Sequence, residues 1–249
     1  MTDETTPIVL MHAFPLNSSM WASQRAALGN RRVIAPDFPG FGGRPADATS
    51  LDDFADHVLA GLRGADIAKA VFVGLSMGGY VAFRIWARSP GSVAALVLAD
   101  TRSGADADVA AQRRTDQAAR VRHEGVAWLS EELIPALLAE RTQRDHPDVV
   151  ESVRSMMLDA NAEGVARALI AMRDRPDSTS LLSRIDVPVL ALVGEHDSVT
   201  PPAESSRIAG SVPNGRFAVV PNAGHLSNLE NPSAFNAELI GFLDELSPC

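Results

Sequence analysis

Ser76 lies in a short motif that suits nucleophilic catalysis. The segment Gly74-Leu75-Ser76-Met77-Gly78 matches the pattern G-x-S-x-G, between the apolar run VFV and a helical stretch. On such a sharp strand-to-helix turn the serine hydroxyl is lifted clear of the backbone. The two glycines leave room for the strand and the helix to pack against each other. A helix that begins directly after the serine also points backbone N–H groups toward developing negative charge. The motif therefore predicts Ser76 as a nucleophile.

A serine nucleophile needs a base, and an acid that orients the base. Among the six histidines, His225 follows the last strand-like run directly and is the candidate base. Two aspartates are candidate acids, Asp197 in the segment GEHDSVTPP and Asp100 at the end of ALVLAD. Both follow strand-like runs, so their positions alone do not decide between them.

Apolar runs that alternate with helical stretches predict the elements that position these residues. Strands are expected at Ile8–Met11, Arg32–Ala35, Ala70–Gly74, Ala94–Ala99, Val187–Val193 and Phe217–Val220. Helices are expected at Leu51–Leu62, Met77–Arg88, Pro202–Ala209 and Ala234–Leu246. The strand runs are continuously apolar, as in strands covered on both faces. The pattern predicts an α/β fold with a mostly parallel sheet and helices on both faces.

The stretch 102–182 interrupts this alternation, because it contains helical, arginine-rich sequence and no strand-like run. Helices are expected there at Ala110–Arg122, Gly125–Ala139, Asp148–Met157 and Gly164–Arg173. A gap of roughly 80 residues is too long for a plain connection within a compact domain. It predicts a helical cap, residues 102–182, inserted between two parts of a core, residues 1–101 and 183–249. An extra helical layer without a role in the site is the alternative.

The predicted cap carries bulky apolar side chains and many arginines. The bulky residues expected to line a substrate pocket are Trp128, Met156, Met157 and Met172, although such residues also form cores between helices. Any one of these arginines that faces the pocket would select a substrate with a carboxylate. They include Arg113, Arg114, Arg120, Arg122, Arg141, Arg144 and Arg154.

Taken together, these motifs resemble the α/β-hydrolase superfamily, and in particular its small, capped esterases and enol-lactonases. Besides the serine motif, four segments in the family's order carry the resemblance: Met11-His12-Ala13-Phe14-Pro15, Asp37-Phe38-Pro39-Gly40-Phe41-Gly42, Gly194-Glu195-His196-Asp197 and Ala223-Gly224-His225. The resemblance implies that Ser76 is the nucleophile, Asp197 the acid and His225 the base, in the family's chain order. It also assigns the oxyanion hole to the backbone N–H groups of Phe14 and Met77.

The chain departs from the family pattern at two places. Ala13 stands where the family usually has glycine, so the oxyanion loop must accommodate a Cβ atom. The family usually begins with a two-stranded hairpin before the strand expected at Ile8–Met11, and only about seven residues precede Ile8. Without that hairpin the strand at Arg32–Ala35 becomes a sheet edge, which favours a homodimer paired through this edge.

The resemblance implies a serine hydrolase that cleaves small carboxylic esters or lactones through an acyl-enzyme intermediate. We expect no metal and no organic cofactor, because this chemistry needs neither. A perhydrolase, a thioesterase or a carbon–carbon hydrolase would use the same triad and differ only in the pocket. A slow-turnover ligand sensor on this fold is an alternative of another class.

Composition argues against several other functions. The formal net charge of −9 and a pI near 5.1 disfavour phosphate backbones and anionic lipid surfaces, so we expect neither a nucleic-acid nor a membrane partner. No apolar run approaches the ~20 residues that span a bilayer. The acidic, polar start MTDETTPIV does not resemble a signal peptide, which predicts a cytoplasmic location. The single cysteine, Cys249, excludes an internal disulfide framework.

Overall fold

The computed structural model describes residues 6–246, in which six parallel strands form one sheet. The strands are β1 (Ile8–Met11), β2 (Val33–Ile34), β3 (Ala70–Leu75), β4 (Val93–Ala99), β5 (Val189–Gly194) and β6 (Gly215–Val220). Their spatial order is β2-β1-β3-β4-β5-β6, and every neighbouring pair is parallel. The predicted fold class is confirmed, and each strand lies within two residues of its predicted bounds.

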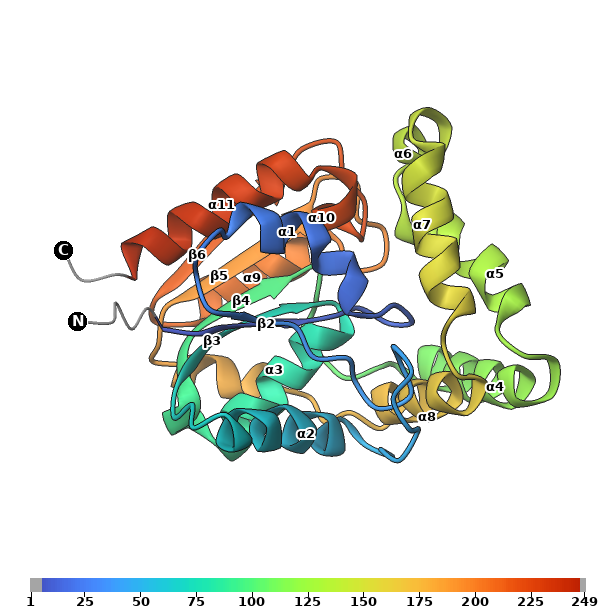
Figure 1. Ribbon diagram of the computed structural model, residues 1–249, viewed down its shortest axis with the longest axis horizontal. Helices are drawn as coiled ribbons and strands as arrows, with labels where there is room; N and C mark the ends of the chain where they lie inside the picture. Colours follow the sequence, from blue (N-terminus) through green and yellow to red (C-terminus); the bar gives the residue numbers. More distant parts are fainter. Residues whose placement is uncertain (1–5, 247–249) are drawn as a thin grey trace.

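Helices cover both faces of the sheet (Figure 1). One face carries α2 (Leu51–Gly64), α3 (Met77–Arg88) and α9 (Pro202–Ser211), and the other carries α1 (Ala22–Ala27), α10 (Ser227–Glu230) and α11 (Pro232–Glu245). Successive strand residues point to opposite faces, so Val9 and Met11 enter one core while Ile8 and Leu10 enter the other. This double covering explains why the strand sequences are continuously apolar. Three short 3-10 helices complete this part, at Ser18–Trp21, Pro90–Ser92 and Thr179–Arg184.

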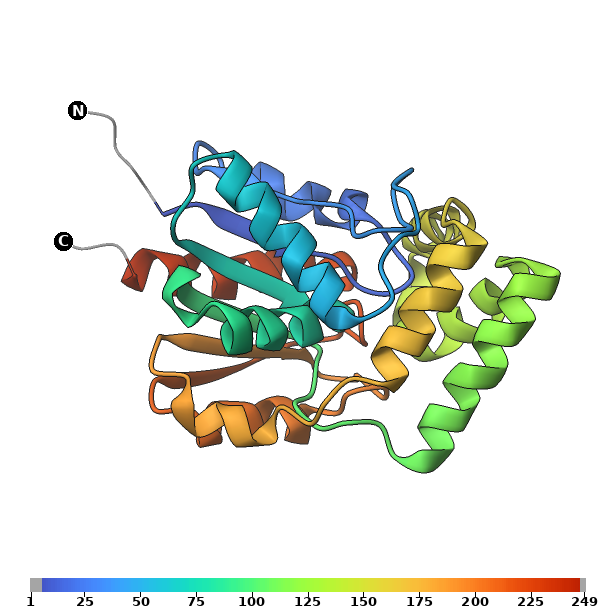
Figure 2. The ribbon, with the colours of Figure 1, turned by 90° about the horizontal axis from the view of Figure 1, so that it is seen from below.

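Five helices lie between β4 and β5 in the sequence. In space they lie beside the carboxyl ends of the strands (Figure 2). They are α4 (Asp108–Glu124), α5 (Ala127–Leu137), α6 (Glu140–Asp145), α7 (Pro147–Leu158) and α8 (Ala162–Arg173). The four helices predicted here are confirmed, and α6 is a further one. We refer to α4–α8 as the cap. Within residues 6–246, cap included, no helix is long and apolar enough to cross a membrane.

β2 forms one outer edge of the sheet in the described part of the chain. No strand of residues 6–246 lies outside it, so the hairpin usual in the family is absent from this range. β2 pairs with β1 over only two residues, Val33 and Ile34, and such a short edge offers few free backbone groups. Pairing of this edge with a second copy of the chain stays a prediction.

Candidate active site

The carboxyl ends of the parallel strands bring the candidate residues together at the edge of the sheet beside the cap. Ser76 directly follows β3, and Asp100 directly follows β4. Asp197 comes three residues after the end of β5, and His225 five residues after the end of β6. Because neighbouring strands of a parallel sheet end at the same edge, residues up to 149 positions apart become neighbours.

The turn at Ser76 has the strained geometry that its motif predicts. Ser76 has φ 54° and ψ −110°, and α3 begins at the next residue. A Cβ atom on Gly74 would lie 2.3 Å from the Gly78 carbonyl oxygen, and one on Gly78 would lie 2.2 Å from the Met11 carbonyl oxygen. The predicted need for glycine on both sides of the serine is therefore confirmed, since any side chain there would push the strand and the helix apart.

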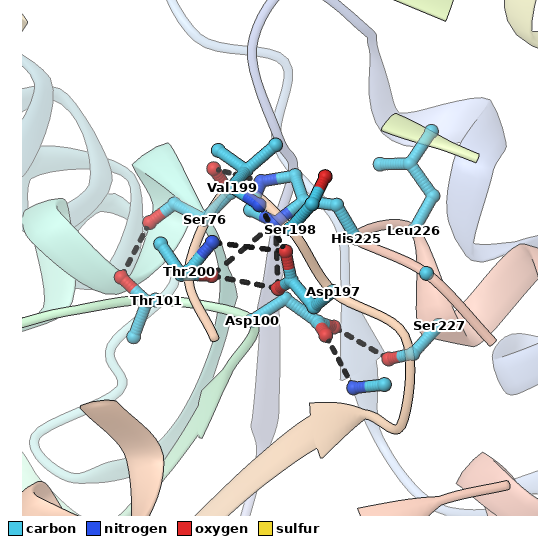
Figure 3. A network of polar contacts seen from close by, with 12 residues as sticks. Ser76, Asp100, Thr101, Asp197, Ser198, Val199, Thr200, His225, Leu226 and Ser227 are labelled. Atoms are coloured by element: carbon cyan, nitrogen blue, oxygen red, sulfur yellow. Dashed lines mark hydrogen bonds and ion pairs between the residues drawn. The ribbon is translucent and has the colours of Figure 1, made fainter. Parts of the chain in front are cut away.

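Ser76, His225 and Asp197 form a continuous hydrogen-bonded chain (Figure 3). His225 Nε2 lies 2.9 Å from Ser76 Oγ, and His225 Nδ1 lies 2.8 Å from Asp197 Oδ2. The carboxylate can only accept a hydrogen bond, so it holds the proton on Nδ1 and leaves the lone pair of Nε2 facing the serine hydroxyl. This arrangement can remove the serine proton.

The Asp197 carboxylate is held from several sides. Its Oδ1 accepts hydrogen bonds from the backbone N–H groups of Val199 and Thr200, and its Oδ2 accepts one from Thr200 Oγ1 at 2.7 Å. Burial acts to raise the pKa of Asp197, but the His225 imidazole and the Thr200 donors hold this pKa below its ordinary value. The group next to the histidine is therefore an ionised carboxylate at neutral pH.

Asp100, the rival acid, has different partners. Its carboxyl oxygens accept hydrogen bonds from Gly194 N and Ser227 Oγ, and within residues 6–246 it makes no hydrogen bond to His225. Burial, followed by the negative charge of Asp197, raises the pKa of Asp100 well above its ordinary value. Geometry and charge both place Asp197, not Asp100, beside the histidine.

The two residues expected to form the oxyanion hole lie near Ser76: Met77 follows it at the start of α3, and Phe14, after β1, lines the same cavity. In the described residues neither amide donates a hydrogen bond to another group, so both are free to bind an oxyanion. The Cβ atom of Ala13, at the family's glycine position, is accommodated in the buried core beneath the loop. His12 braces this loop, because its Nδ1 bonds to the Ala13 carbonyl and its Nε2 accepts from Phe38 N at 3.0 Å.

His12 makes the stability of the fold depend on pH. Burial lowers the pKa of His12 to about 4 from 6.5, so in this window the unfolded chain binds a proton that the folded chain does not. Above pH 6.5 this effect leaves the free energy of unfolding at its full value. As the pH falls from 6.5 through about 4, the free energy of unfolding decreases by about 3 kcal/mol. When the free energy of unfolding is measured with urea at several pH values, it should depend less steeply on pH for His12→Gln than for the wild type. His123→Gln, on α4, is the control, and equal slopes for His12→Gln and wild type would contradict the prediction.

A cavity of about 220 Å³ lies over Ser76, between the core and the cap. Its floor includes Phe14, Ser76 and His225, and its roof is made by α4, α5 and α8. Of the four predicted pocket residues, Met172 lines this cavity, as do the arginines Arg113 and Arg114. The cavity is mainly apolar, with a few cationic groups.

The other three predicted pocket residues lie elsewhere, which corrects the expectation. Trp128 lines a separate hollow formed by residues of α4 and α5, under the guanidinium of Arg120. Met156 and Met157 are buried among apolar side chains where α7 packs on α5. They form core inside the cap because α7 does not contact the cavity.

Several cavity residues were not predicted, and among them Tyr80 and Arg102 carry polar groups. Tyr80 lies one helical turn after Ser76 on α3, so helical spacing alone could have indicated that it shares the face of the nucleophile. Arg102 comes two residues after Asp100, and no local pattern distinguishes it from the other arginines.

Positive charge gathers on the wall of the cavity that includes Arg102. The buried carboxylate of Asp106 pairs with three guanidinium groups, those of Arg102, Arg114 and Arg175. One carboxylate against three guanidinium groups leaves an excess of positive charge, and the buried Arg102 Nε has no acceptor among residues 6–246. The described residues contain no group of three or more His, Cys, Asp or Glu that could hold a metal ion.

A parallel α/β sheet with a serine turn, a histidine and an acid at its carboxyl edge defines a class of hydrolytic proteins. A family model described as the alpha/beta hydrolase fold matches residues 6–232, and the chain belongs to this family. The predicted family resemblance is thereby confirmed.

Among similar proteins, a thermophilic esterase from Thermogutta terrifontis, solved with malate bound, superposes with a TM-score of 0.95 at 40% identity. The match covers 98% of this chain and 91% of that one. An enol-lactonase structure from Burkholderia xenovorans superposes with a TM-score of 0.90 at 28% identity, and the match covers 96% of this chain and 92% of that one. The 3-oxoadipate enol-lactonase 2 of Acinetobacter baylyi is 28% identical over 92% of this chain and 85% of its own length. These relatives and the family together support hydrolase activity for this chain.

Proposed function

We propose that this protein is a serine hydrolase that cleaves small carboxylic esters or lactones. The observation that carries the proposal is the hydrogen-bonded chain from Ser76 Oγ through both ring nitrogens of His225 to Asp197. The similar esterase and enol-lactonases support an ester or lactone bond as the bond that is cleaved.

In the proposed reaction Ser76 Oγ attacks the carbonyl carbon of the substrate while His225 Nε2 takes the hydroxyl proton. The carbonyl electrons move onto oxygen, where the N–H groups of Phe14 and Met77 stabilise the negative charge by about 3 kcal/mol for each donor. Collapse of this intermediate expels the alkoxide, which receives the proton from His225, and leaves an acyl group on Ser76. A water molecule, deprotonated by His225, then releases the carboxylic acid and restores the serine.

Intact mass after treatment with a fluorophosphonate tests the proposal. The wild type is expected to gain the mass of one adduct, and Ser76→Ala to gain none, because only a serine activated by its base reacts readily. Esters and lactones of different acyl size and charge can then be compared as substrates. A folded wild type that forms no adduct would overturn the proposal.

We further propose that the preferred substrate carries a carboxylate besides the bond that is cleaved. The excess positive charge around Asp106 and the arginines that line the cavity, Arg102, Arg113 and Arg114, support this. Guanidinium groups bind carboxylates well, so an anionic substrate group in the cavity would find a cationic partner on this wall. The Thermogutta terrifontis esterase was solved with malate, itself a carboxylate, bound.

Replacing Arg102 by glutamine is expected to change specificity. For the mono-para-nitrophenyl ester of glutarate, kcat/KM should fall about tenfold or more, which is the loss of one charged hydrogen bond. For para-nitrophenyl hexanoate, a neutral ester of similar length, it should change by less than about threefold. Arg122→Gln is the matched control, because Arg122 pairs with Glu163 and does not line the cavity. Equal losses for both esters in Arg102→Gln would show that this arginine does not recognise a carboxylate.

A further inference from the structure

Asp100 is a buried carboxyl group that the proposed reaction does not use. It directly follows β4, its side chain is fully buried, and its φ is 46°, in the left-handed region that few residues other than glycine adopt. A strained backbone and a buried carboxyl group both cost free energy, so they persist where specific contacts compensate for them. The contacts of Asp100 therefore indicate its role.

These contacts reach the loops of both the acid and the base (Figure 3). One carboxyl oxygen, Oδ1, accepts a hydrogen bond from Gly194 N at 2.8 Å, and the other, Oδ2, accepts one from Ser227 Oγ at 2.5 Å. Gly194 ends β5, three residues before Asp197. Ser227 comes two residues after His225. A single side chain from a third strand thus joins the two loops.

We propose that Asp100 is a positioning residue that holds the Asp197 loop and the His225 loop at the separation that the hydrogen bond between these two residues requires. This inference rests on the proposed function, because it concerns the same triad. On the N-terminal side of His225 a backbone hydrogen bond joins the two loops, since His196 N donates to Ala223 O at 2.8 Å. After His225 they are joined through Asp100.

Glu230 is the other buried carboxyl group near the base, and its contacts differ. Its Oε1 accepts from the backbone N–H groups of Gly224 and Leu226, while its Oε2 accepts from Ala139 N and Thr142 Oγ1 of the cap. Glu230 therefore shapes the His225 loop against the cap. The Glu195 side chain of the acid loop accepts a hydrogen bond from Asn222 N, before His225, whereas Asp100 bonds to Gly194 and to Ser227, after His225.

A neutral carboxyl group at position 100 suits this role. Burial raises the pKa of Asp100 well above its ordinary value, and the charges of Asp197 and Glu230 act in the same direction. A protonated Asp100 keeps both contacts, since one oxygen accepts from Gly194 N while the other donates to Ser227 Oγ. It also adds no second negative charge beside Asp197. Asparagine has the same shape and the same pattern of one acceptor and one donor.

The test compares second-order rate constants for fluorophosphonate labelling, measured by intact mass well below each variant's melting temperature. Asp100→Ala is expected to slow labelling by about 10- to 100-fold, because a small misplacement of catalytic groups has effects of this size. Asp100→Asn should restore the rate to within about threefold of the wild type, and Ser227→Ala, which removes one of the two contacts, should slow it by about three- to tenfold. Val97→Ala is the control for general destabilisation, because Val97 is buried on the same strand and its apolar side chain cannot hydrogen-bond to either loop. It should lower Tm and leave the rate unchanged.

Each outcome decides the inference. If Asp100→Ala lowers Tm but labels at the wild-type rate, Asp100 is only structural and the inference fails. If Asp100→Asn is as slow as Asp100→Ala, a negative charge is required and the positioning role is again wrong. If Asp100→Ala does not fold, an unchanged rate for Ser227→Ala overturns the inference instead. A folded wild type that forms no adduct would overturn the proposed function and this inference together, whereas the other results leave the proposed function intact.

Discussion

Replacing His225 by glutamine is expected to lower kcat for ester hydrolysis by about 10⁵-fold or more. The His225 ring joins Ser76 and Asp197 through its two nitrogens, at 2.9 and 2.8 Å. Glutamine fills a similar volume, but its amide cannot accept a proton at neutral pH and later return it to the leaving group. Both the formation and the breakdown of the acyl-enzyme depend on that transfer, so neither step is expected to proceed at a useful rate.

Steady-state kinetics with the para-nitrophenyl esters, together with a Tm measurement, checks this expectation. His196→Gln is the matched control, because His196 neighbours the acid but its side chain is about half exposed and outside the hydrogen-bonded chain. It should keep kcat within about threefold of the wild type. A His225→Gln protein that is folded and retains more than about one per cent of kcat would show that another group acts as the base.

Replacing Asp197 by asparagine is expected to lower kcat by about 10⁴-fold while the fold is retained. The backbone N–H groups of Val199 and Thr200 select the amide oxygen for the place of Oδ1, so the amide NH₂ takes the place of Oδ2, facing His225 Nδ1. A donor in that place forces the imidazole into the other tautomer, with its proton on Nε2. In this tautomer His225 cannot accept the proton of Ser76.

The comparison with Asp100→Asn makes the Asp197 prediction specific. Both aspartates are buried and follow adjacent strands, so an effect of amide substitution on folding alone would be similar at the two positions. We expect a large loss of kcat only for Asp197→Asn, measured with the same esters at the same pH. Two variants of equal activity would contradict the assignment of Asp197 as the triad acid.

The helical cap shows where reasoning from local sequence reaches its limit. The four predicted cap helices are present, because helix formation depends on residues a few positions apart. Which apolar side chains face the cavity depends instead on how the helices pack. Met172 on α8 lines the cavity, whereas Met156 and Met157 on α7 are buried against α5. Core and cavity lining have the same composition, so the sequence could not distinguish them.

The sequence by itself determined the α/β sheet, the sharp turn at Ser76 and the strand ends that carry His225 and the two candidate acids. These features depend on short-range patterns, namely apolar runs, glycine spacing and helix periodicity. The family's chain order indicated Asp197 as the acid, and the structure places it against His225. Only the tertiary structure decided that Asp100 contacts Gly194 and Ser227, and that Asp106 gathers three arginines beside the cavity. Such choices rest on distances of a few ångströms between loops far apart in the chain. These distances are set by the packing of the whole sheet and its cap, which no local pattern encodes.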